Sequence, residues 1–428
     1  MKTLHFTNSW HGTSGGIGTF YKALFEAANR ERQQMRLVVP GETSRVELVG
    51  EFGRVHHIES PRAPLYPEYR MLYPYRYLFP RTAVQRILND ERPDLIEVSE
   101  KYTTPYLAGL LRTRRLPGVS YRPTVVGLSH ERMSESMVAY VSGHPWAQRF
   151  CAWYMKAIYF PLFDHHITVS EHTAAELIDA SKGHKVRRGI WISPMGVDCD
   201  RFTPARQSAD ARRELLERTG GDSSTTLLFY AGRLAPEKNL GLLLDTMRHL
   251  DADYRLAIAG DGIELERLRS AAAHRGLRNV AFLGQVKDRD LLARYYASAD
   301  VFVHPNPREP FGIAPLEAMS AGLALVAPNS GGVTSYADET NAWLSRPEGA
   351  DFADSIRAIR RDPAARKLRT ATGRRTAERY SWPNVTSNYL RLYREIHALT
   401  QGEQLHLTIK PRSFSTPGDA FGRELIEL

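Results

Sequence analysis

The stretch TLHFTNSWHGTSGGIGTFYKALF, residues 3–25, predicts a strand, a glycine-rich loop and a helix in that order. The apolar strand covers residues 3–7, and the loop carries Gly15, Gly16 and Gly18 ahead of the helix. At such a junction backbone amides and a helix N-terminus can face an anion. The same glycines also suit an ordinary tight turn, and their order departs from the strict GxGxxG pattern of dinucleotide dehydrogenases.

Apolar strand-like runs alternate with helical stretches along the rest of the chain. In the first half they are RLVVPG (36–41), RVHHI (54–58), PDLIEVS (93–99), PTVVGLSH (123–130) and HHITVS (165–170). In the second half they are TLLFYAG (226–232), YRLAIAG (254–260), VAFLG (280–284), DVFVHP (300–305) and LALVAP (323–328). This alternation predicts an α/β fold with parallel sheets covered on both faces.

The length of 428 residues favours two such domains. We expect the first domain over residues 1–198 and the second over 199–381. A helix over residues 382–398 is expected to return to the first domain, and residues 401–428 are expected to form a polar tail.

Composition narrows the class of protein. Hydrophobic residues make up 42% and charged residues 25%, which is ordinary for a folded globular chain. The two cysteines, Cys151 and Cys199, have neither a metal-ligand nor a disulfide-framework spacing. The N-terminus lacks a signal-peptide pattern, and no stretch approaches the roughly 20 apolar residues of a membrane span. A cytoplasmic location is therefore expected, with peripheral contact at the inner face of the membrane as a further option.

The net charge of +9 and the pI of about 9.4 indicate acidic partners. Sugar nucleotides, phospholipid headgroups and nucleic acid all meet that description. Because no nucleic-acid-binding motif is present, nucleic acid is excluded as the expected partner.

The segment GRLAPEKNL, residues 232–240, places two cations at the end of a predicted strand. Arg233 and Lys238 lie five positions apart around a proline turn. Arginine supplies a bidentate fork and lysine a point charge, so together they can offset the charge of a departing diphosphate. A solvated strand-to-helix loop is the alternative.

The segment REPFGIAPLEAMSAGLALVAPNSGGV, residues 308–333, brackets a loop with two carboxylates. Glu309 lies before a helix expected to begin near Pro315, and Glu317 is expected in its first turn. The loop amides suit phosphate and sugar oxygens, while the two acids can accept hydrogen bonds from hydroxyls. Two surface glutamates that cap a helix would show the same pattern.

Taken together, these motifs resemble the large retaining family of GT-B glycosyltransferases, over nearly all of residues 1–398. The motifs are Gly15-Gly16, Ser170-Glu171, Pro194-Met195-Gly196-Val197-Asp198, Gly232-Arg233, Glu237-Lys238-Asn239, Gly260-Asp261-Gly262, Phe282-Leu283-Gly284 and the pair Glu309 and Glu317. The resemblance implies two Rossmann-like domains that face each other across a cleft and hold a nucleotide-sugar donor.

The resemblance also implies roles for single residues. Gly16 would approach the donor phosphates, and Arg233 and Lys238 would bind the pyrophosphate. Glu309 would hold hydroxyls of the transferred sugar, and His130 would lie beside that sugar. Glu317 would hold the ribose, and the backbone near Val286 would hold the base. The implied catalytic residues are His130, Arg233, Lys238 and Glu309. The implied donor-binding residues are Gly15, Gly16, Val286, Phe311, Gly312, Ile313, Ala314 and Glu317. No protein nucleophile is assigned.

Two stretches are similar to the GDP-mannose-dependent α-mannosyltransferase branch of this family. They are EVSE (97–100) and SHERMSE (129–135), and they depart from that branch at Glu100 and at Met133-Ser134-Glu135. GDP-mannose is therefore the first expected donor and a UDP-hexose the second, with a saccharide or glycolipid hydroxyl as acceptor. A sugar-nucleotide epimerase and a non-catalytic sugar-nucleotide-binding protein are the rival functions.

Neither a metal ion nor another cofactor is expected. Three Asp-x-Asp triplets occur, at residues 198–200, 251–253 and 288–290. None follows a strand end beside the phosphate-binding elements, and the resemblance implies that Arg233 and Lys238 replace the metal.

A basic, aromatic surface is predicted over residues 66–81 and 112–122, where it would contact an anionic membrane or an acceptor sugar. A partly buried loop with a solvated face is the alternative.

Overall fold

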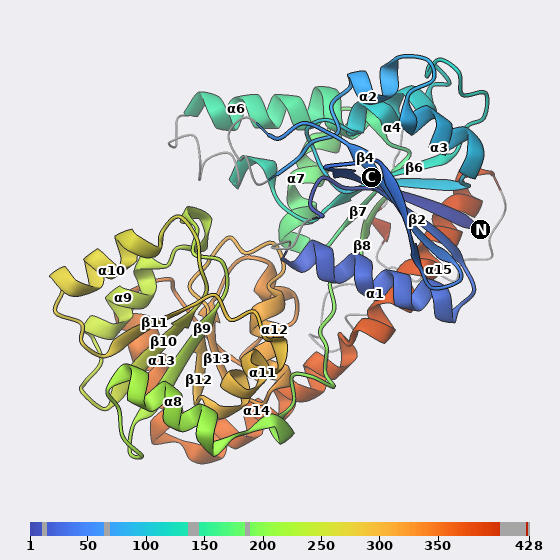
Figure 1. The fold of residues 1–428 in the computed structure, drawn as a ribbon. Helices are drawn as coiled ribbons and strands as arrows, with labels where there is room; N and C mark the ends of the chain where they lie inside the picture. The colour runs from blue at the N-terminus through green and yellow to red at the C-terminus, as the bar shows by residue number, and fades with distance from the viewer. Residues whose placement is uncertain (11–14, 64–68, 136–144, 185–188, 403–424, 427–428) are drawn as a thin grey trace. The chain divides into compact units, whose positions relative to one another are not determined.

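The computed structural model describes residues 1–10, 15–63, 69–135, 145–184, 189–402 and 425–426. The chain divides into two compact units (Figure 1). Unit 1 contains Met1–Met195 and the segment that begins at Trp382, and unit 2 contains Gly196–Ser381. Among the described residues, none of the helices combines the length and the apolar character that a bilayer span requires.

Unit 1 is built on a nine-stranded sheet with the order β15-β8-β7-β6-β5-β1-β2-β4-β3. Its strands are β1 (Lys2–Phe6), β2 (Gln34–Gly41), β3 (Arg45–Val49), β4 (Gly53–Glu59), β5 (Leu95–Val98), β6 (Thr124–Ser129), β7 (His165–Thr168), β8 (Ile190–Ile192) and β15 (Leu425–Ile426). Neighbouring strands are parallel except at the two edges of the sheet. There β3 pairs antiparallel with β4, and β15 pairs antiparallel with β8. The predicted parallel sheet is confirmed, whereas β3 and β8 were not predicted; β3 is largely exposed and therefore carries no apolar run.

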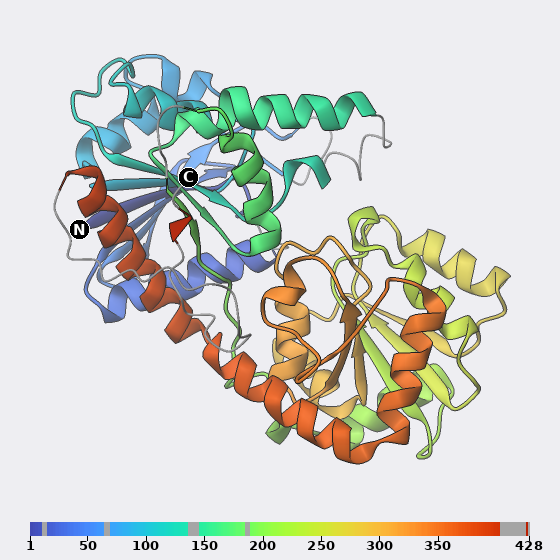
Figure 2. The same ribbon diagram turned by 180° about the vertical axis from the view of Figure 1, so that it is seen from behind.

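Helices cover both faces of this sheet (Figure 2). They are α1 (Gly16–Arg30), α2 (Tyr75–Leu78), α3 (Ala83–Glu91), α4 (Pro105–Arg112), α6 (Pro145–Tyr154), α7 (Glu171–Ser181) and α15 (Trp382–Thr400). Helix α1 buries Phe20, Tyr21 and Leu24, which share one face at helical spacing. Helix α7 is capped by Ser170, whose hydroxyl accepts from the amide of Thr173 in a capping box.

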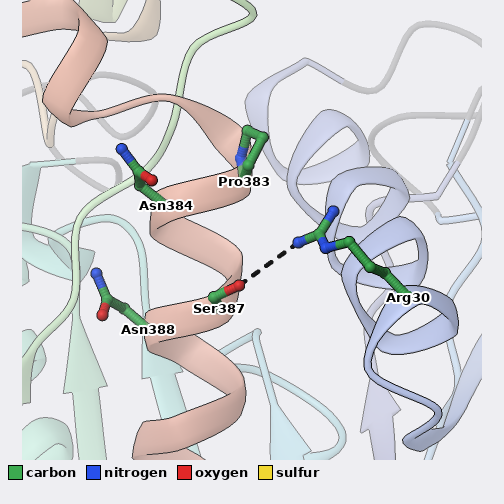
Figure 3. A pocket seen from close by; sticks show the side chains of 5 residues that line it. All are labelled: Arg30, Pro383, Asn384, Ser387 and Asn388. Atoms are coloured by element: carbon green, nitrogen blue, oxygen red, sulfur yellow. Dashed lines mark hydrogen bonds between the residues drawn. The ribbon is translucent and has the colours of Figure 1, made fainter.

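Helix α15 belongs to unit 1, as the returning helix was predicted to do. Its Tyr389 ring packs against Phe20 of α1 at 4.8 Å, and its hydroxyl donates to the carbonyl oxygen of Ser193 at 2.7 Å. Where the two helices approach each other they line an open pocket, in which Arg30 of α1 donates to Ser387 at 3.4 Å (Figure 3). The predicted tail at 401–428 lies mostly outside the described residues, although its residues 425–426 form β15.

One buried carboxylate joins four elements of unit 1. Glu97 of β5 is fully buried and accepts hydrogen bonds from the hydroxyls of Tyr21 and Tyr393, while His5 Nδ1 lies 3.0 Å from Glu97 Oε1. Burial and the Glu97 charge raise the pKa of both tyrosines well above the ordinary value, so that their hydroxyls stay protonated and donate. Helices α1 and α15 are thus tied to the sheet through one acceptor.

Unit 2 has a six-stranded, fully parallel sheet with the order β11-β10-β9-β12-β13-β14. Its strands are β9 (Thr226–Ala231), β10 (Tyr254–Ala259), β11 (Val280–Gly284), β12 (Val301–Val303), β13 (Ala324–Pro328) and β14 (Trp343–Ser345). Its helices are α8 (Ala209–Thr219), α9 (Gly241–Arg248), α10 (Leu265–His274), α11 (Arg289–Ser298), α12 (Ile313–Ser320), α13 (Gly349–Arg361) and α14 (Pro363–Arg379). All five predicted strands form, and the three-residue β14 was not predicted.

The Glu97 contacts predict unequal effects of two tyrosine substitutions on α15. Tyr393→Phe removes a hydrogen bond to a buried carboxylate and should lower the free energy of unfolding by about 2 kcal/mol. Tyr389→Phe removes a bond to a neutral carbonyl and should lower it by about 1 kcal/mol. Urea denaturation of both variants checks this order, and an equal or larger loss in Tyr389→Phe would contradict it.

Candidate functional site

The loops at the carboxyl ends of the unit 2 strands carry most of the predicted site residues. In a parallel sheet these loops meet at one edge, which is where such folds bind ligands. The loops after β9 and β10 are joined by backbone bonds, because Gly232 donates to Ala259 at 3.0 Å and Leu234 donates to Asp261 at 2.8 Å. A side chain at Gly260, whose φ is +150°, would collide with the carbonyl oxygen of Gly232. Glycine is therefore required for this close approach.

Glu309 and Lys238 form an ion pair at this edge. Lys238 Nζ lies 3.0 Å from Oε1 and 2.8 Å from Oε2 of Glu309, and Asn306 Nδ2 donates to Oε2 at 3.0 Å. The side chains are 22% exposed for Lys238 and 12% for Glu309. Lys238 ends the short turn after β9, and Glu309 lies in the loop after β12. The structure thus brings together two residues that are 71 positions apart.

The surroundings fix the protonation of this cluster. Burial alone would raise the pKa of Glu309, but the charge of Lys238 and the hydrogen bonds from Lys238 and Asn306 outweigh it and lower the pKa to about 2. Burial lowers the pKa of neighbouring His304 to about 4, against the attraction of Glu309. At neutral pH the cluster therefore contains an ionised carboxylate, an ammonium group and a neutral imidazole, with His304 Nε2 lying 3.8 Å from Glu309 Oε2.

Glu317 has a different partner. It is 6% exposed and accepts from Arg289 Nη2 at 2.9 Å, while the guanidinium carbon of Arg289 lies 5.0 Å from the centre of the Phe202 ring. Burial raises the pKa of Glu317 despite this cation. Arg289 was not among the predicted site residues, although it is the central residue of the Asp-Arg-Asp triplet at 288–290. Asp288 of this triplet caps α11 by accepting from the amide of Asp290.

The predicted start of α12 was wrong by two residues. The helix begins at Ile313, directly after Gly312 with φ +93°, so Glu317 lies in its second turn and not in its first. An earlier start is possible because Gly312 adopts the left-handed conformation that ends the preceding loop, and Tyr336 fixes this turn by donating to the Gly312 carbonyl at 2.6 Å. The first amides of α12, including those of Ile313 and Ala314, lack acceptors within the helix and suit an anion.

The remaining unit 2 residues differ in their exposure. The side chain of Phe311 is buried against Tyr336 at 5.1 Å, which leaves only its backbone for a ligand. Arg233 is 55% exposed, and its Nη2 lies 2.5 Å from Glu237 Oε1. Val286 is half-buried and lies two residues beyond the end of β11, at the same edge of the sheet.

Three of the predicted residues lie in unit 1. Gly15 precedes α1 and Gly16 is its first residue, whereas the preceding loop residues 11–14 lie outside the described residues. His130 follows β6, and its Nδ1 is buried without a hydrogen-bond partner among the described residues. Burial lowers the pKa of His130, so the ring is neutral at pH 7.

A buried ion pair that the sequence did not reveal holds the segment after His130. Lys101 Nζ lies 2.9 Å from Glu176 Oε2 and also donates to the carbonyl oxygen of Glu131. Glu176 accepts from the backbone amides of Met133 and Ser134, both at 3.0 Å. Its pKa is lowered, because Lys101 and these amides outweigh the effect of burial. The stretch Met133-Ser134-Glu135, which departs from the mannosyltransferase pattern, is thus held in place by Glu176.

Two doubly wound α/β units, one with an acid and lysine cluster at its ligand edge, define the GT-B class of glycosyltransferase. The structure is similar to sucrose-phosphate synthase from Thermosynechococcus elongatus, with a TM-score of 0.72 at 21% identity over 93% of this chain and 100% of that one. Residues 211–379 match the family described as glycosyl transferases group 1, and residues 15–188 match the glycosyl transferase 4-like domain.

Two Mycobacterium tuberculosis proteins are similar in sequence over most of the chain. One is a GDP-mannose-dependent alpha-(1-6)-phosphatidylinositol dimannoside mannosyltransferase, 30% identical over 91% of this chain and 95% of that protein. The other is a GDP-mannose-dependent alpha-mannosyltransferase, 30% identical over 83% of this chain and 85% of that protein. The chain belongs to this family of glycosyltransferases, and the predicted family and enzyme class are confirmed.

The shifted pKa of Glu309 predicts a pH-dependent contribution to stability. Because its folded pKa of about 2 lies below the unfolded value of 4.5, Glu309 stabilises the fold fully above pH 4.5, and this contribution is lost as the pH falls toward 2. Glu309→Gln should lower the free energy of unfolding by about 3 kcal/mol at pH 7 and by less below pH 4.5. Denaturation at several pH values measures the difference.

Glu266→Gln provides the control, because Glu266 forms an exposed ion pair within α10. This variant should stay within about 0.5 kcal/mol of the unsubstituted protein at every pH. A Glu309→Gln penalty that does not shrink in acid would mean that Glu309 is not held ionised by its surroundings.

Proposed function

We propose that this protein is a retaining mannosyltransferase that moves the sugar of GDP-mannose to a hydroxyl of a saccharide or glycolipid. The observation that carries the proposal is the Lys238 and Glu309 pair at the carboxyl edge of the unit 2 sheet. The names of the two similar mycobacterial proteins support GDP-mannose as the donor. Members of the family use several nucleotide sugars, so the choice of GDP-mannose as donor is what the proposal adds to the family assignment.

Lys238 is suited to the leaving group of this reaction. Its ammonium group has three donors and is partly exposed, so a donor diphosphate can reach it while Glu309 stays bound on its other side. When the bond between C1 of the sugar and the phosphate oxygen breaks, the diphosphate leaves with the electron pair. Lys238 then neutralises charge that is larger in the transition state than in the bound donor. Arg233, exposed on the same loop, supplies a second cation once the diphosphate competes with Glu237.

Glu309 is suited to the transferred sugar. A carboxylate held ionised accepts hydrogen bonds only, and sugar hydroxyls are donors. By orienting the sugar, Glu309 fixes the face of C1 that the acceptor oxygen approaches. Attack from the face that the diphosphate leaves retains the anomeric configuration, and the acceptor proton passes to the departing phosphate oxygen. This route requires no nucleophile on the protein, and neutral His130 is assigned a place beside the sugar.

Glu317 is suited to the nucleoside end of the donor. Its carboxylate is buried beside Arg289 and lies one helical turn beyond the α12 amides. We assign the ribose hydroxyls to Glu317, the diphosphate to the amides from Gly312 to Ala314, and the base to the backbone near Val286. In unit 1 we assign the phosphates to Gly15 and Gly16.

The acceptor side follows from the same proposal. A glycolipid acceptor requires the protein to approach a membrane surface, and the positive net charge of +9 favours an anionic one. Within the predicted aromatic stretch at 66–81, the described part exposes Tyr75 and Phe79. Neither a metal ion nor another cofactor has a role in this proposal, because Lys238 and Arg233 supply the charge that would otherwise come from a cation.

A donor panel tests the proposal directly. The purified protein is incubated with GDP-mannose, UDP-glucose or UDP-galactose, with and without mannosyl-phosphatidylinositol acceptors, and the release of nucleoside diphosphate is measured. We expect the highest kcat/KM with GDP-mannose. A preference for a UDP-hexose would identify the second candidate donor, and the anomeric configuration of the product, determined by NMR, decides between retention and inversion.

Two substitutions separate the chemical step from donor binding. Lys238→Ala should lower kcat by about 30-fold to 1,000-fold, with a smaller change in donor affinity, because its contact strengthens in the transition state. Glu317→Ala should chiefly raise the donor KM, since ribose contacts change little during transfer. Lys367→Ala removes an exposed lysine of α14 and should leave both parameters unchanged. Turnover in folded Lys238→Ala that matches the unsubstituted enzyme would refute its assignment to the diphosphate.

Metal removal is the simplest further test. With Lys238 and Arg233 neutralising the diphosphate, activity should survive an excess of EDTA with less than about a twofold loss. Initial rates before and after chelation, with Mg²⁺ and Mn²⁺ added back, measure the effect. Complete loss of activity that either ion restores would contradict the metal-independent mechanism.

A further inference from the structure

Helix α6 (Pro145–Tyr154) presents aromatic side chains to solvent. Trp146 is 61% exposed, Phe150 is 44% exposed and Trp153 is 54% exposed. Their spacing of four and three residues places them in one stripe along the helix. Cys151 and Tyr154 line the neighbouring side of α6 and are buried in the core of unit 1. One side of α6 therefore anchors the helix, and the aromatic stripe has no part in that anchoring.

Two rings of the stripe lie against each other. The ring centres of Phe150 and Trp153 are 5.9 Å apart, and the ring centre of Phe150 also lies 6.3 Å from that of the buried Tyr154. Large aromatic side chains usually bury most of their surface, and a cluster left in water indicates a binding surface. None of the proposed donor contacts involves these residues.

The sequence segment that carries the stripe contains positive charges and no negative ones. Between Glu135 and Asp164 the sequence contains no acidic residue. Arg149 of α6 and Lys156, in the turn that continues α6, are both exposed. Their spacing of seven residues places both cations on one side of the aromatic stripe. We call these five residues, Trp146, Arg149, Phe150, Trp153 and Lys156, the α6 face.

We propose that the α6 face docks on an anionic lipid bilayer. Tryptophan and phenylalanine partition into the boundary between headgroups and acyl chains, while arginine and lysine stay at the level of the lipid phosphates. The complementary charge of anionic headgroups selects a bilayer over a neutral apolar partner. The role of this docking rests on the proposed function, since a protein docked in this way would reach a glycolipid acceptor in the membrane.

Vesicle binding without turnover tests this surface separately from the transfer reaction. The full chain is mixed with vesicles of phosphatidylcholine alone, or of phosphatidylcholine with phosphatidylglycerol or phosphatidylinositol, in the absence of any sugar nucleotide. Co-sedimentation should show binding to the anionic vesicles that weakens as salt is raised. Tryptophan fluorescence should shift to the blue and be quenched by brominated lipid chains.

Two variants and one control define the contribution of the α6 face. Trp146→Ser with Phe150→Ser and Trp153→Ser should lower partition into anionic vesicles at least about tenfold. Arg149→Gln with Lys156→Gln should lower it by about threefold or more and reduce its salt dependence. Ile263→Ser with Leu368→Ser removes two apolar side chains that are 73% and 66% exposed in unit 2, and should leave partition unchanged.

Circular dichroism and thermal unfolding establish that each variant is folded. Unchanged vesicle binding in the folded triple aromatic variant would overturn the proposal, as would equal binding of the original protein to neutral and anionic vesicles. A concentration-dependent dimer that the triple variant abolishes, without vesicle binding, would assign the face to a second copy of the chain. A raised KM for a water-soluble acceptor alone would assign it to the acceptor sugar. If vesicles bind as expected but no donor is turned over, the surface stands and the proposed function fails.

Discussion

The buried carboxylate of Glu97 is the constraint on which the assembly of unit 1 depends. A charge removed from water must be compensated by donors, and here these come from Tyr21 on α1, His5 on β1 and Tyr393 on α15. Since Tyr393 lies 296 positions along the chain from Glu97, the last helix must return to the first sheet to supply its hydroxyl. The two ends of unit 2 also pair, because the Val197 amide donates to the Tyr380 carbonyl at 2.9 Å.

In unit 2, two glutamate side chains have opposite pKa shifts because their surroundings differ. Glu309 and Glu317 both lie near the start of α12, and both are buried. Glu309 receives an ammonium group and an amide donor, which lower its pKa, whereas burial dominates at Glu317 and raises its pKa beside Arg289. In the proposed reaction this difference matches their roles. The residue beside the reacting sugar remains an ionised acceptor, and the other contacts a part of the donor that does not react.

The part of unit 1 that follows strand β6 is organised around a buried ion pair. Lys101 and Glu176 hold the segment from Glu131 to Ser134, which follows the β6 strand end. Beyond this anchored segment the chain reaches α6, whose core side is buried with Tyr154 donating to the Lys101 carbonyl at 2.7 Å. The segment that follows His130 and the exposed aromatic helix are therefore both bonded to Lys101. A membrane held by α6 and a sugar held near His130 would act on the same part of unit 1.

The sequence by itself determined the two parallel α/β units, the returning helix and the family. Short apolar runs and the glycines that follow them reflect the conformational preferences of neighbouring residues. They therefore predict strands and turns from the sequence alone. Short or exposed elements such as β3, β8 and β14 carry too few apolar residues for that.

Only the tertiary structure decided which charges meet. Lys238 with Glu309, Arg289 with Glu317 and Lys101 with Glu176 join residues 71, 28 and 75 positions apart, a distance over which no local pattern carries information. The exposed face of α6 likewise depends on which side of the helix the core covers, because its aromatic residues alone would equally suit a buried helix.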